Sequence, residues 1–501
     1  MRQKLSRRAA PVLAGLILAG PILAGLILAG CTVGPDYRKP DAPDTPAFKE
    51  LQGWTPSHPA DAIDKGAWWS VYNDPDLDRL ERMVDISNQT IKSYEAQYRN
   101  AVALVAEARA GLFPTISAGA EASRTGSGAR AGGVSSSSSG NISRNGATYT
   151  LSGNVDWDLD IWGRIRRQVE SSTASAQVSA ADLANARLSA QATLAVDYFN
   201  LRTEDSLAKL LSETAEAYKQ SLRITENQYK AGTASSIDYV TALTQLQSTQ
   251  AQLIAVGIQR AQYEHAIAVL TGQPPASFSL PAAPLAAEVP VVPAGIPSTL
   301  LQRRPDIAAA ERNMQSLNAQ IGVAIAAYFP AVSLSALGEA AGSPIGQLFN
   351  LENRFWSLAA SGTQTLFNGG LRSAQVDAAR ASYDQGVATY RQTVLTAFQQ
   401  VEDALSSLRI LQLQASAQDL AVSSARRAVT ATLNAYKAGT VAYTSVVVEQ
   451  ATLLSNEQTA LGVRQSRLVQ SVDLIQALGG GWQAGDLPDV EQMHVPSPLR
   501  P

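Results

Sequence analysis

The sequence contains few of the residue types on which most enzymes and metalloproteins depend. Among its 501 residues there are one cysteine and three histidines. The histidines, His58, His265 and His494, are far apart and lack the spacing of a zinc site, and His265 falls in a segment with a helical pattern. No second cysteine is present to form a disulfide within the chain, and no histidine lies near the cysteine to activate it as a nucleophile. We therefore expect no catalytic residue and no metal site.

Strongly basic segments are also missing. The formal net charge is −3, and residues 1–30 contain basic residues but no acid, which leaves 36 basic against 43 acidic groups in the rest of the chain. A mildly acidic chain without a basic cluster has no electrostatic footprint for nucleic acid. A hydrophobic content of 45% argues against a disordered protein.

Proline and glycine are nearly absent from two segments of equal length, Arg164–Lys230 and Leu371–Lys437. Each spans 67 residues without proline, and Gly386 is the only glycine in either segment. At ~1.5 Å per residue, each segment could form a helix of roughly 100 Å. Apolar and small residues recur every seven positions, which indicates a left-handed coiled coil, although a long helix of an ordinary bundle would also fit. The first series is Leu194, Leu201, Ala208, Ala215, Leu222 and Tyr229, and the second is Val394, Val401, Leu408, Ala415, Val422, Val429 and Tyr436.

The single cysteine, Cys31, follows a basic start and an apolar run that ends at Gly30, which is the order of a secretory signal. The Leu-Ala-Gly-Cys ending of this run is similar to a bacterial lipobox, in which the cysteine is acylated and the chain is cut before it. A transmembrane anchor is the alternative, because the run is long enough to span a membrane, but Pro21 in its middle counts against it. We predict a signal peptide and a covalent lipid on Cys31, with no other cofactor.

The chain repeats itself at a separation of about 207 residues. The string Tyr229-Lys230-Ala231-Gly232-Thr233 returns as Tyr436-Lys437-Ala438-Gly439-Thr440, and Phe113-Pro114 returns as Phe329-Pro330. A period this long indicates one large unit that was duplicated and fused, rather than a solenoid. The predicted divisions are a signal peptide (1–30), a lipidated arm (31–70), repeat 1 (71–274), a Pro-rich linker (275–297), repeat 2 (298–482) and a C-terminal tail (483–501).

Each repeat contains a helical hairpin. After the Ala-Gly-Thr turns, the helical pattern resumes over Ser236–Leu270 and Thr444–Leu478. Gly232 and Gly439 stand where a helix ends in a left-handed residue, and Ser235 or Ser236 could cap the next helix. A further helix opens each repeat, over about Pro75–Leu112 and Ser298–Tyr328.

Between the helices the hydrophobic period changes to two. Thr148–Ile161 places apolar residues on one face and Asp156, Asp158 and Asp160 on the other, which predicts a strand. A lipid-facing barrel strand shows this alternation and so does a strand of a soluble sandwich, but three aspartates on one face favour water. We take these aspartates as candidate acids of a lumen that favours cations. The other predicted strands are Thr115–Ala122, Ala331–Ala340 and about Phe355–Phe367.

Two local alternatives were weighed against the strand pattern. The loop over Gly126–Gly146 is rich in glycine and serine, but a strand follows it and no Walker-type lysine string occurs, which disfavours phosphate binding. Asp156, Asp158 and Asp160 have the spacing that opens a calcium loop, but the glycine and glutamate that should follow are missing.

Four strands are too few for a closed membrane barrel, because bacterial barrels begin at about eight strands and an open edge in lipid leaves backbone groups unsatisfied. Several chains must therefore share one barrel, with their helical hairpins beneath it. We predict an α+β membrane protein with a long coiled-coil α-helical tunnel, and three copies of the chain would give a 12-stranded barrel above it.

In combination, several motifs resemble the TolC-like outer-membrane factors of tripartite efflux systems, in their lipidated OprM-like (NodT-type) branch. These motifs are Leu28–Cys31, Thr32–Tyr37, Arg303–Ile307, Phe329-Pro330 and both Lys-Ala-Gly-Thr tips. The resemblance implies a homotrimer in the outer membrane with a periplasmic tunnel, and Thr32 after the cysteine favours that membrane. It also implies docking of a periplasmic adaptor at the helical tips, which include Gly232, Thr233, Gly439 and Thr440. The adaptor would connect an inner-membrane pump, RND type by this resemblance, which supplies the energy.

The resemblance further implies a gate at the periplasmic ends of the second-half helices. Tyr436 and Lys437 match its tyrosine and basic residue. Relatives often carry an aspartate where this chain has Val448, so the acidic partner is left open between Asp238 and Glu449. Ordinary helix-end residues are the alternative interpretation.

Parts of the sequence are also compatible with other functions. An envelope tether or coiled-coil scaffold would explain the helices and the lipid, but not the amphipathic strands. A duct for secreted proteins or metal ions is the runner-up to export of antibiotics and other toxic small molecules. Only four methionines occur, which disfavours a thioether path for copper or silver.

Overall fold

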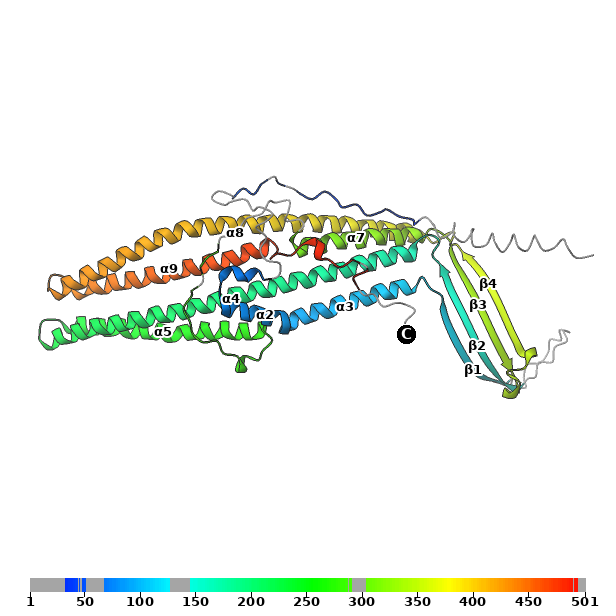
Figure 1. The fold of residues 1–501 in the computed structure, drawn as a ribbon, viewed down its shortest axis with the longest axis horizontal. Helices are drawn as coiled ribbons and strands as arrows, with labels where there is room; N and C mark the ends of the chain where they lie inside the picture. The colour runs from blue at the N-terminus through cyan, green and yellow to red at the C-terminus, as the bar shows by residue number, and fades with distance from the viewer. Residues whose placement is uncertain are drawn as a thin grey trace, which may run out of the picture.

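Two very long helices, α4 (Arg164–Lys230) and α8 (Leu371–Lys437), run the length of the helical part, and a β-sheet extends from one end of it (Figure 1). The computed structural model describes residues 32–43, 45, 47–50, 67–126, 145–286, 288–290, 303–489 and 491–493. The predicted signal peptide, Cys31, His58, His494 and most of the glycine-rich loop lie outside the described residues. The predicted bounds of both long helices are confirmed.

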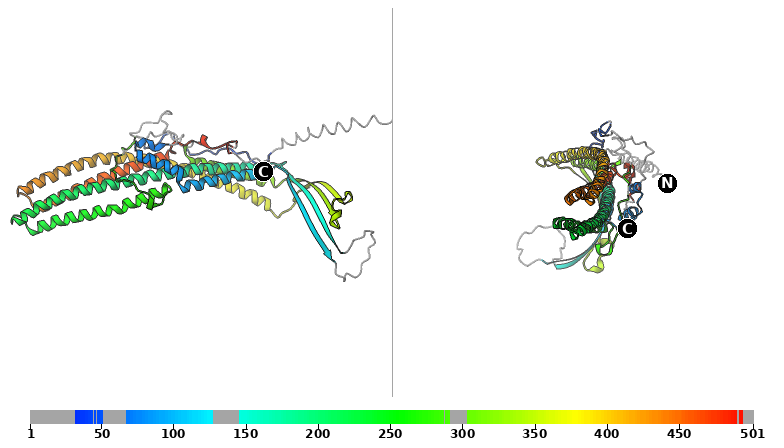
Figure 2. Two further views of the ribbon diagram at one scale, coloured as in Figure 1. Left: turned by 60° about the horizontal axis from the view of Figure 1, so that its bottom comes forward. Right: turned by 90° about the vertical axis from the view of Figure 1, so that its left-hand side faces the viewer.

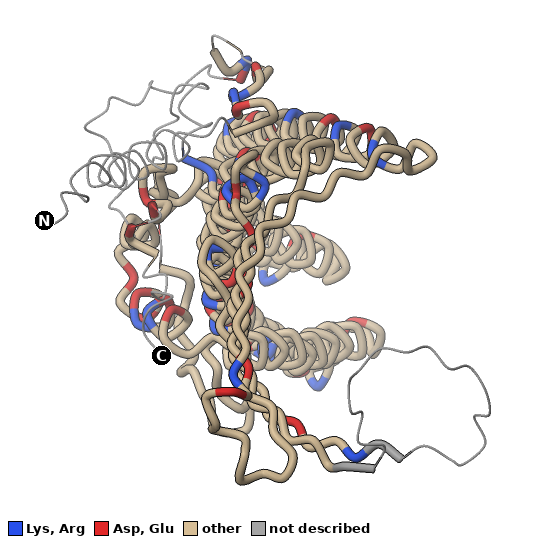
Figure 3. The backbone as a smooth tube through the Cα atoms, turned by 90° about the vertical axis from the view of Figure 1, so that its right-hand side faces the viewer, with Lys and Arg blue, Asp and Glu red and all other residues tan. Residues whose placement is uncertain are grey.

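Shorter helices pack along the two long ones. In the half of the molecule farther from the sheet, α5 (Ser236–Leu270) packs on α4, and α9 (Tyr443–Ala477) lies between α4 and α8. In the half nearer the sheet, α3 (Gln89–Ala110) packs on α4, and α7 (Pro305–Ala326) lies between α4 and α8. The result is a curved layer of helices rather than a closed bundle, as the view along its length shows (Figure 3). The described part of the N-terminal arm lies against the convex side of this layer (Figure 2).

The predicted continuous helix over Pro75–Leu112 is wrong. The structure breaks it into α2 (Pro75–Ser87) and α3, with Asn88 in an extended conformation between them. The Asn88 side chain accepts hydrogen bonds from the amides of Thr90 and Ile91, at 2.9 and 3.1 Å, so it caps α3. The first five residues of the other predicted opening helix, 298–302, lie outside the described residues, and α7 begins at Pro305. The short 3-10 helices are η1 (Trp68–Tyr72), η2 (Pro275–Ser277), η3 (Ile345–Gln347), η4 (Leu351–Asn353) and η5 (Ala484–Asp486).

The sheet has four antiparallel strands in the order of the chain. They are β1 (Thr115–Gly126), β2 (Asn145–Leu159), β3 (Ala331–Gly342) and β4 (Arg354–Thr363). β2 belongs to the first half of the chain and β3 to the second, so their pairing joins the two repeats. With 10 to 15 residues each, the strands are long enough to cross a hydrocarbon layer. Within the described residues, the outer edges of β1 and β4 have no partner strand.

The two faces of the sheet are continuous across all four strands. Asp156 lies opposite Thr115 of β1 and Ser335 of β3, whereas Val155 lies opposite Ile116 and Ala336. Residues on β4 follow the same alternation. Its polar face carries Ser357 and Ser361, and its apolar face carries Trp356, Leu358 and Ala360. One face is therefore suited to lipid and the other to water.

Two predicted strands run past the C-terminal ends of the observed ones. β2 ends at Leu159 rather than Ile161, because the carboxylate of Asp160 turns to the start of α4. β4 ends at Thr363 rather than Phe367, because its neighbour β3 begins at Ala331, which lies opposite Thr363. Beyond that point β4 has no described strand on either side.

The largest apolar core lies near the middle of the molecule, where η1 and α2 pack against the long helices. Trp68, Tyr198, Phe199 and Tyr390 are among its largest buried side chains. The arm contributes Phe48, whose ring lies 6.4 Å from that of Phe398 on α8. Among the described residues, no helix combines the length and the apolar character that crossing a bilayer requires.

Candidate functional site

The helical tips have the backbone that their sequence predicts. Gly232 and Gly439 adopt φ values of 77° and 75°, in the left-handed region that glycine tolerates best. The amides of Thr233 and Thr440 return to Gln228 and Ala435 at 2.9 and 3.0 Å, which ends each long helix. Both glycines and both threonines are exposed, as a docking surface for another protein requires.

The start of α5 differs from the start of α9. Ser235 caps α5 by accepting from the amide of Asp238 at 3.2 Å, and the Asp238 carboxylate accepts from the amide of Ser235 at 3.2 Å. This reciprocal arrangement is a capping box. Ala442, at the corresponding place before α9, supplies no side-chain cap. The Asp238 carboxylate is therefore used to cap its own helix in the single chain, although its negative charge still acts on Tyr436.

The two repeat-related tyrosines lie in different surroundings. Tyr436 is 7% exposed and packs with Tyr443, Val446 and Ala242, whereas Tyr229 is 45% exposed. Burial raises the pKa of Tyr436, and the negative charge of Asp238 raises it further, while Thr225 opposes the shift. Asp238 is therefore close enough to Tyr436 for its charge to act on the buried ring.

The two repeat-related lysines also differ. Lys230 pairs with Glu226, one turn earlier on α4, at 2.6 Å. The residue one turn before Lys437 is Leu433, and Lys437 makes no ion pair with any described residue. Glu449 is half-buried on α9 and likewise has no described ion-pair partner. Lys437 and Glu449 are not brought together within one chain.

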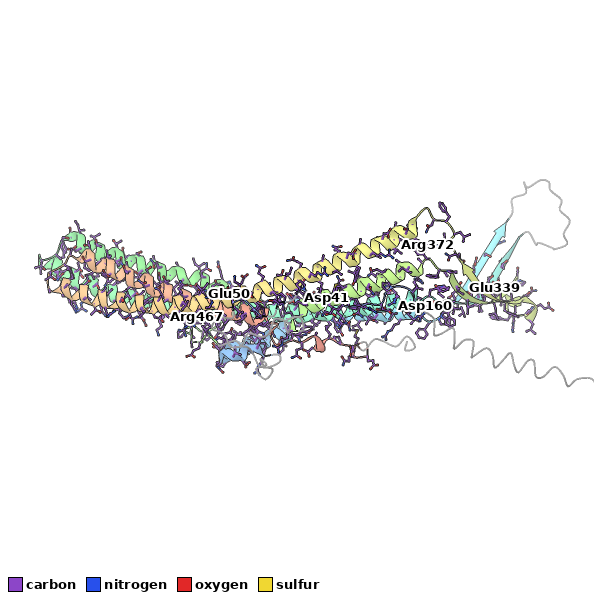
Figure 4. The ribbon with its side chains drawn as sticks, turned by 90° about the horizontal axis from the view of Figure 1, so that it is seen from above. Asp41, Glu50, Asp160, Glu339, Arg372 and Arg467 are labelled. Atoms are coloured by element: carbon purple, nitrogen blue, oxygen red, sulfur yellow. The ribbon has the colours of Figure 1, made fainter. Side chains whose placement is uncertain are left out.

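Two of the three candidate lumen acids lie where the sequence places them. Asp156 and Asp158 are exposed on the polar face of β2. Asp160 does not belong to that face, which corrects the prediction. Its carboxylate accepts from the amides of Ile165 and Arg166 at 2.8 and 2.9 Å, and it also pairs with the Arg166 guanidinium at 3.2 Å. It therefore caps α4 at the junction of helices and sheet, where Figure 4 shows it, with Glu339 on the sheet beyond.

Sequence reasoning missed two residues that join stacked helices at mid-length. Asn88 donates to the carbonyl of Leu270, the last residue of α5, at 2.8 Å. Arg304 donates to the carbonyl of Ala477, the last residue of α9, at 3.0 Å, and holds Asp306 through two bonds of 3.0 and 2.6 Å. Leu270 and Ala477 are equivalent in the two repeats. The same helix end is therefore bound by Asn88 in the first half and by Arg304 in the second. A polar residue just before a helical start was the sequence signal for both residues, and Arg304 also lies in the Arg303–Ile307 motif, but neither signal predicted these contacts.

Polar contacts hold the N-terminal arm along α4, α7 and α8 in the half of the molecule nearer the sheet. Arg167, which is 5% exposed, binds Asp36 at 2.7 Å, and Lys39 pairs with Glu311 at 2.7 Å. Farther along, the Glu402 carboxylate accepts from the amides of Lys49 and Glu50. Figure 4 shows Asp41 and Glu50 of the arm along the helices. The arm thereby follows the helices from Thr32, beside Gly163 at the sheet junction, to the middle of the molecule.

The lateral edges of the curved layer expose apolar side chains. On one edge, Ile254 and Ile258 of α5 are 78% and 61% exposed. On the other edge, Leu413 and Leu420 of α8 are 67% and 72% exposed. The edge strands β1 and β4 connect to α3 and α8, so the open edges of the sheet and of the helical layer lie on the same two sides. In the described ranges, no three His, Cys, Asp or Glu side chains gather as metal ligands.

Comparison with known proteins identifies the family to which this architecture belongs. The family model described as "Outer membrane efflux protein" matches residues 83–273 and 296–480. The antibiotic efflux pump outer membrane protein ArpC of Pseudomonas putida is 31% identical over 465 residues, covering 90% of this chain and 93% of ArpC. The cation efflux system protein CusC of Escherichia coli O6:H1 is 29% identical over 464 residues, covering 90% and 96%. The solved structure of the outer-membrane channel OprN matches with a TM-score of 0.81 at 30% identity, covering 90% of this chain and all of that one. The chain therefore belongs to the outer membrane efflux protein family and is an efflux channel of the outer membrane.

Proposed function

We propose that three copies of this chain close into one barrel and one tunnel, and that this homotrimer is the passive exit duct of a tripartite efflux pump. The observation that carries the proposal is the sheet, which has one apolar face, one polar face and two edges without a partner among the described strands. An unpaired edge in hydrocarbon leaves backbone amides and carbonyls unsatisfied, at a cost of several kcal/mol each. Edge-to-edge association removes that cost, and three copies give about 12 strands, within the range of bacterial barrels.

The helical layer supports the same association. Ile254 and Ile258 on one edge and Leu413 and Leu420 on the other are costly to leave in water, since burying one such side chain contributes about 1.5–3 kcal/mol. Association of the α5 edge of one copy with the α8 edge of the next would bury both sets and close the curved layer into a tube.

The lipid, the adaptor and the pump complete the proposed assembly. A lipid on Cys31 would lie next to Thr32, which contacts Gly163 at the junction of helices and sheet. The lipid would therefore enter the same membrane as the barrel. The exposed tips at Gly232, Thr233, Gly439 and Thr440 would receive a periplasmic adaptor, and an inner-membrane pump, of RND type, would supply the energy for transport.

The resting gate would form at the tips of the second-half helices. In this proposal Lys437 is the basic member of the gate, and the buried Tyr436 ring holds its helix end in place. Lys437 has no acidic partner among the described residues of its own chain, which suits an acceptor supplied by a neighbouring copy. Glu449 has no ion-pair partner among the described residues, and the charge of Asp238 acts on Tyr436, so either acid could accept across the interface. Exposed ion pairs contribute roughly 0–1 kcal/mol each, so such a lock would open readily.

Antibiotics and other toxic small molecules are the proposed cargo, in keeping with the printed name of ArpC. The name of CusC makes cation export the second candidate. Two of the methionines that could carry soft metal ions, Met314 and Met493, are buried, at 0% and 4% exposure, so they would not line a lumen. Small organic molecules remain the favoured cargo.

Two measurements test the duct. Purified protein in mild detergent should run as a heat-sensitive trimer on gels and should conduct ions in planar bilayers. Protein that stays monomeric and never conducts would contradict the proposal and would favour an envelope tether or scaffold instead.

A further inference from the structure

The charged residues of the described strands are divided between the two faces of the sheet. The acidic ones all lie on the polar face, and they are Glu121, Asp156, Asp158 and Glu339. The basic ones, Arg124 of β1 and Arg354 of β4, lie on the apolar face, opposite Ala147 and Ala340. A guanidinium is costly to place in hydrocarbon, so both positions require polar surroundings on the lipid side of the sheet.

Both arginines lie at the end of the sheet that is farther from the helices. β1 runs away from the helical part and Arg124 is near its end, whereas β4 runs back towards α8 and Arg354 is its first residue. The two strand ends are together at this side of the sheet (Figure 1). Because the helical tunnel of an outer-membrane efflux channel is periplasmic, this end of the sheet faces the outside of the cell.

Aromatic residues of the apolar face mark the depth of the two arginines. Trp356 lies two residues inside Arg354 on β4 and is 71% exposed. Tyr149 of β2 lies opposite Ala122, which is two residues inside Arg124. In membrane barrels, such aromatic residues lie where the apolar band meets the lipid headgroups. Each arginine therefore lies just beyond the apolar band, at the level of the headgroups of the outer leaflet.

Neither guanidinium is neutralised within the described part of the chain. Arg124 is exposed and forms no hydrogen bond or ion pair with a described residue. Arg354 is exposed as well, and its Nη2 donates to the carbonyl of Phe349 at 3.1 Å, which orients the side chain without supplying a negative charge. Both can therefore bind an external anion, and the fork of an arginine fits the oxygens of a phosphate.

We propose that Arg124 and Arg354 bind phosphate groups of the phosphorylated glycolipid of the outer leaflet. The glycolipid supplies negative charge at the depth of the two arginines, and its acyl chains would cover the apolar face below them. The inference rests on the proposed barrel, in which the apolar face meets lipid. Barrel formation alone does not require a base at either position.

The opposite end of the apolar face argues for the outer leaflet rather than the inner one. Near the helices, this face carries Ile116, Trp157, Val332 and Gly362, and no charged residue belongs to it among the described strands. A surface for the phospholipids of the inner leaflet would need its bases at this end. The basic residues of the lipid side are found at the outer end alone, within the strands that the structure describes.

Binding of purified lipid A tests the proposal. The acylated full chain is extracted from outer membranes in mild detergent, and its binding of diphosphorylated lipid A is measured by native mass spectrometry. Arg124→Gln combined with Arg354→Gln should weaken binding about tenfold, because two charged hydrogen-bonding groups are lost. Arg124→Lys combined with Arg354→Lys keeps both charges and should lose less than about threefold. The matched control is Arg380→Gln, at an exposed position of α8, which should bind like the unmodified protein.

Lipid A without phosphates and phosphatidylglycerol are the comparison ligands. The unmodified protein and the glutamine pair should bind phosphate-free lipid A equally. Equal binding of diphosphorylated lipid A by these two proteins overturns the inference, as does a loss that is the same without the phosphates. Phosphatidylglycerol that binds as tightly as lipid A, with the same loss in the glutamine pair, overturns the assignment to the glycolipid.

The single substitutions Arg124→Gln and Arg354→Gln guard against a pair that does not assemble. Each should weaken binding of diphosphorylated lipid A by about threefold. A conducting trimer that does not distinguish phosphorylated from phosphate-free lipid A overturns the inference and leaves the proposed function standing. Absence of trimer in the unmodified protein overturns both.

Discussion

The ring of Tyr436 lies against the ring of Tyr443, with their centroids 5.2 Å apart and their planes at 59°. Both side chains are buried, at 7% and 2% exposure. In the first repeat, Tyr229 stacks instead on Tyr239 at 5.9 Å and stays largely exposed. The two tips therefore share a five-residue string, but only the second is fastened by a buried aromatic pair.

Replacing Tyr436 with alanine should loosen the second tip. The change removes a buried ring, and buried aromatic-to-alanine changes cost about 3–5 kcal/mol. Hydrogen exchange should speed up at the amides around Thr440, and single-channel conductance should rise. Tyr229→Ala is the matched control and should cost less than about 1 kcal/mol, because its ring is already exposed. Equal exchange effects of the two variants would show that the buried pair does not fasten the tip.

Lys437→Ala should raise the resting conductance and the leakage of antibiotics into cells. The lysine makes no ion pair with any residue that the structure describes, so its loss should act on a contact between copies and leave the melting temperature nearly unchanged. Lys230→Ala is the control, because Lys230 is already paired with Glu226 on the same helix. Unchanged conductance of the Lys437 variant would remove this residue from the gate.

The long helices could be predicted from the sequence because their ends carry unambiguous signals. Arg164–Lys230 and Leu371–Lys437 lack proline and almost all glycine, and each is followed by a glycine that adopts positive φ. No such signal marks Asn88, where the predicted helix is broken. An asparagine is tolerated inside a helix, and its choice of a capping role depends on the carbonyl of Leu270, which tertiary packing brings near.

The ends of the strands also depend on tertiary contacts that the sequence does not reveal. The alternation of polar and apolar residues predicted four strands and their faces, because period two is a local property. The end of β2 was misplaced because Asp160 continues the alternation by sequence but is taken by the amides of Ile165 and Arg166. Whether an aspartate faces a lumen or caps a helix depends on which donors lie within reach, and the sequence does not state this.

Gly34→Ala should detach the N-terminal arm from α7. Gly34 adopts φ +100°, and a Cβ there would lie 2.5 Å from the Cα of Gly322. Either the arm or α7 must therefore move. Limited proteolysis near residue 34 should become faster as a result. Gly232→Ala is the comparison, because its φ of +77° has no atom within 4 Å of the added Cβ, so only the conformational cost of about 1–2 kcal/mol applies. A smaller loss of stability for the Gly34 variant than for the Gly232 variant would contradict this account.

Glu81 on α2 should make the stability of the protein fall as the pH rises. Its side chain is fully buried, and neither carboxylate oxygen has a hydrogen-bond partner within the described part of the chain. Burial raises the pKa of Glu81 well above its ordinary value of 4.5, and the negative charge of Asp85 raises it further. The folded state therefore keeps a proton that the unfolded chain releases near pH 4.5. The contribution to stability is complete below that pH and is lost as the pH rises through the pKa of the folded state.

Glu81→Gln tests this dependence, because glutamine keeps the shape but cannot ionise. The variant should melt close to the unmodified protein at pH 4.5, where Glu81 is protonated in the folded state, and above it at pH 8. The difference between the two melting curves is the quantity to follow, because burial also raises the pKa of Asp85 and Asp473, and these groups act in the same direction in both proteins. Glu216→Gln, at an exposed position of α4, should leave the pH dependence unchanged. Melting temperatures that stay parallel from pH 4.5 to pH 8 would mean that water or a cation reaches the Glu81 carboxylate and satisfies it in the assembled channel.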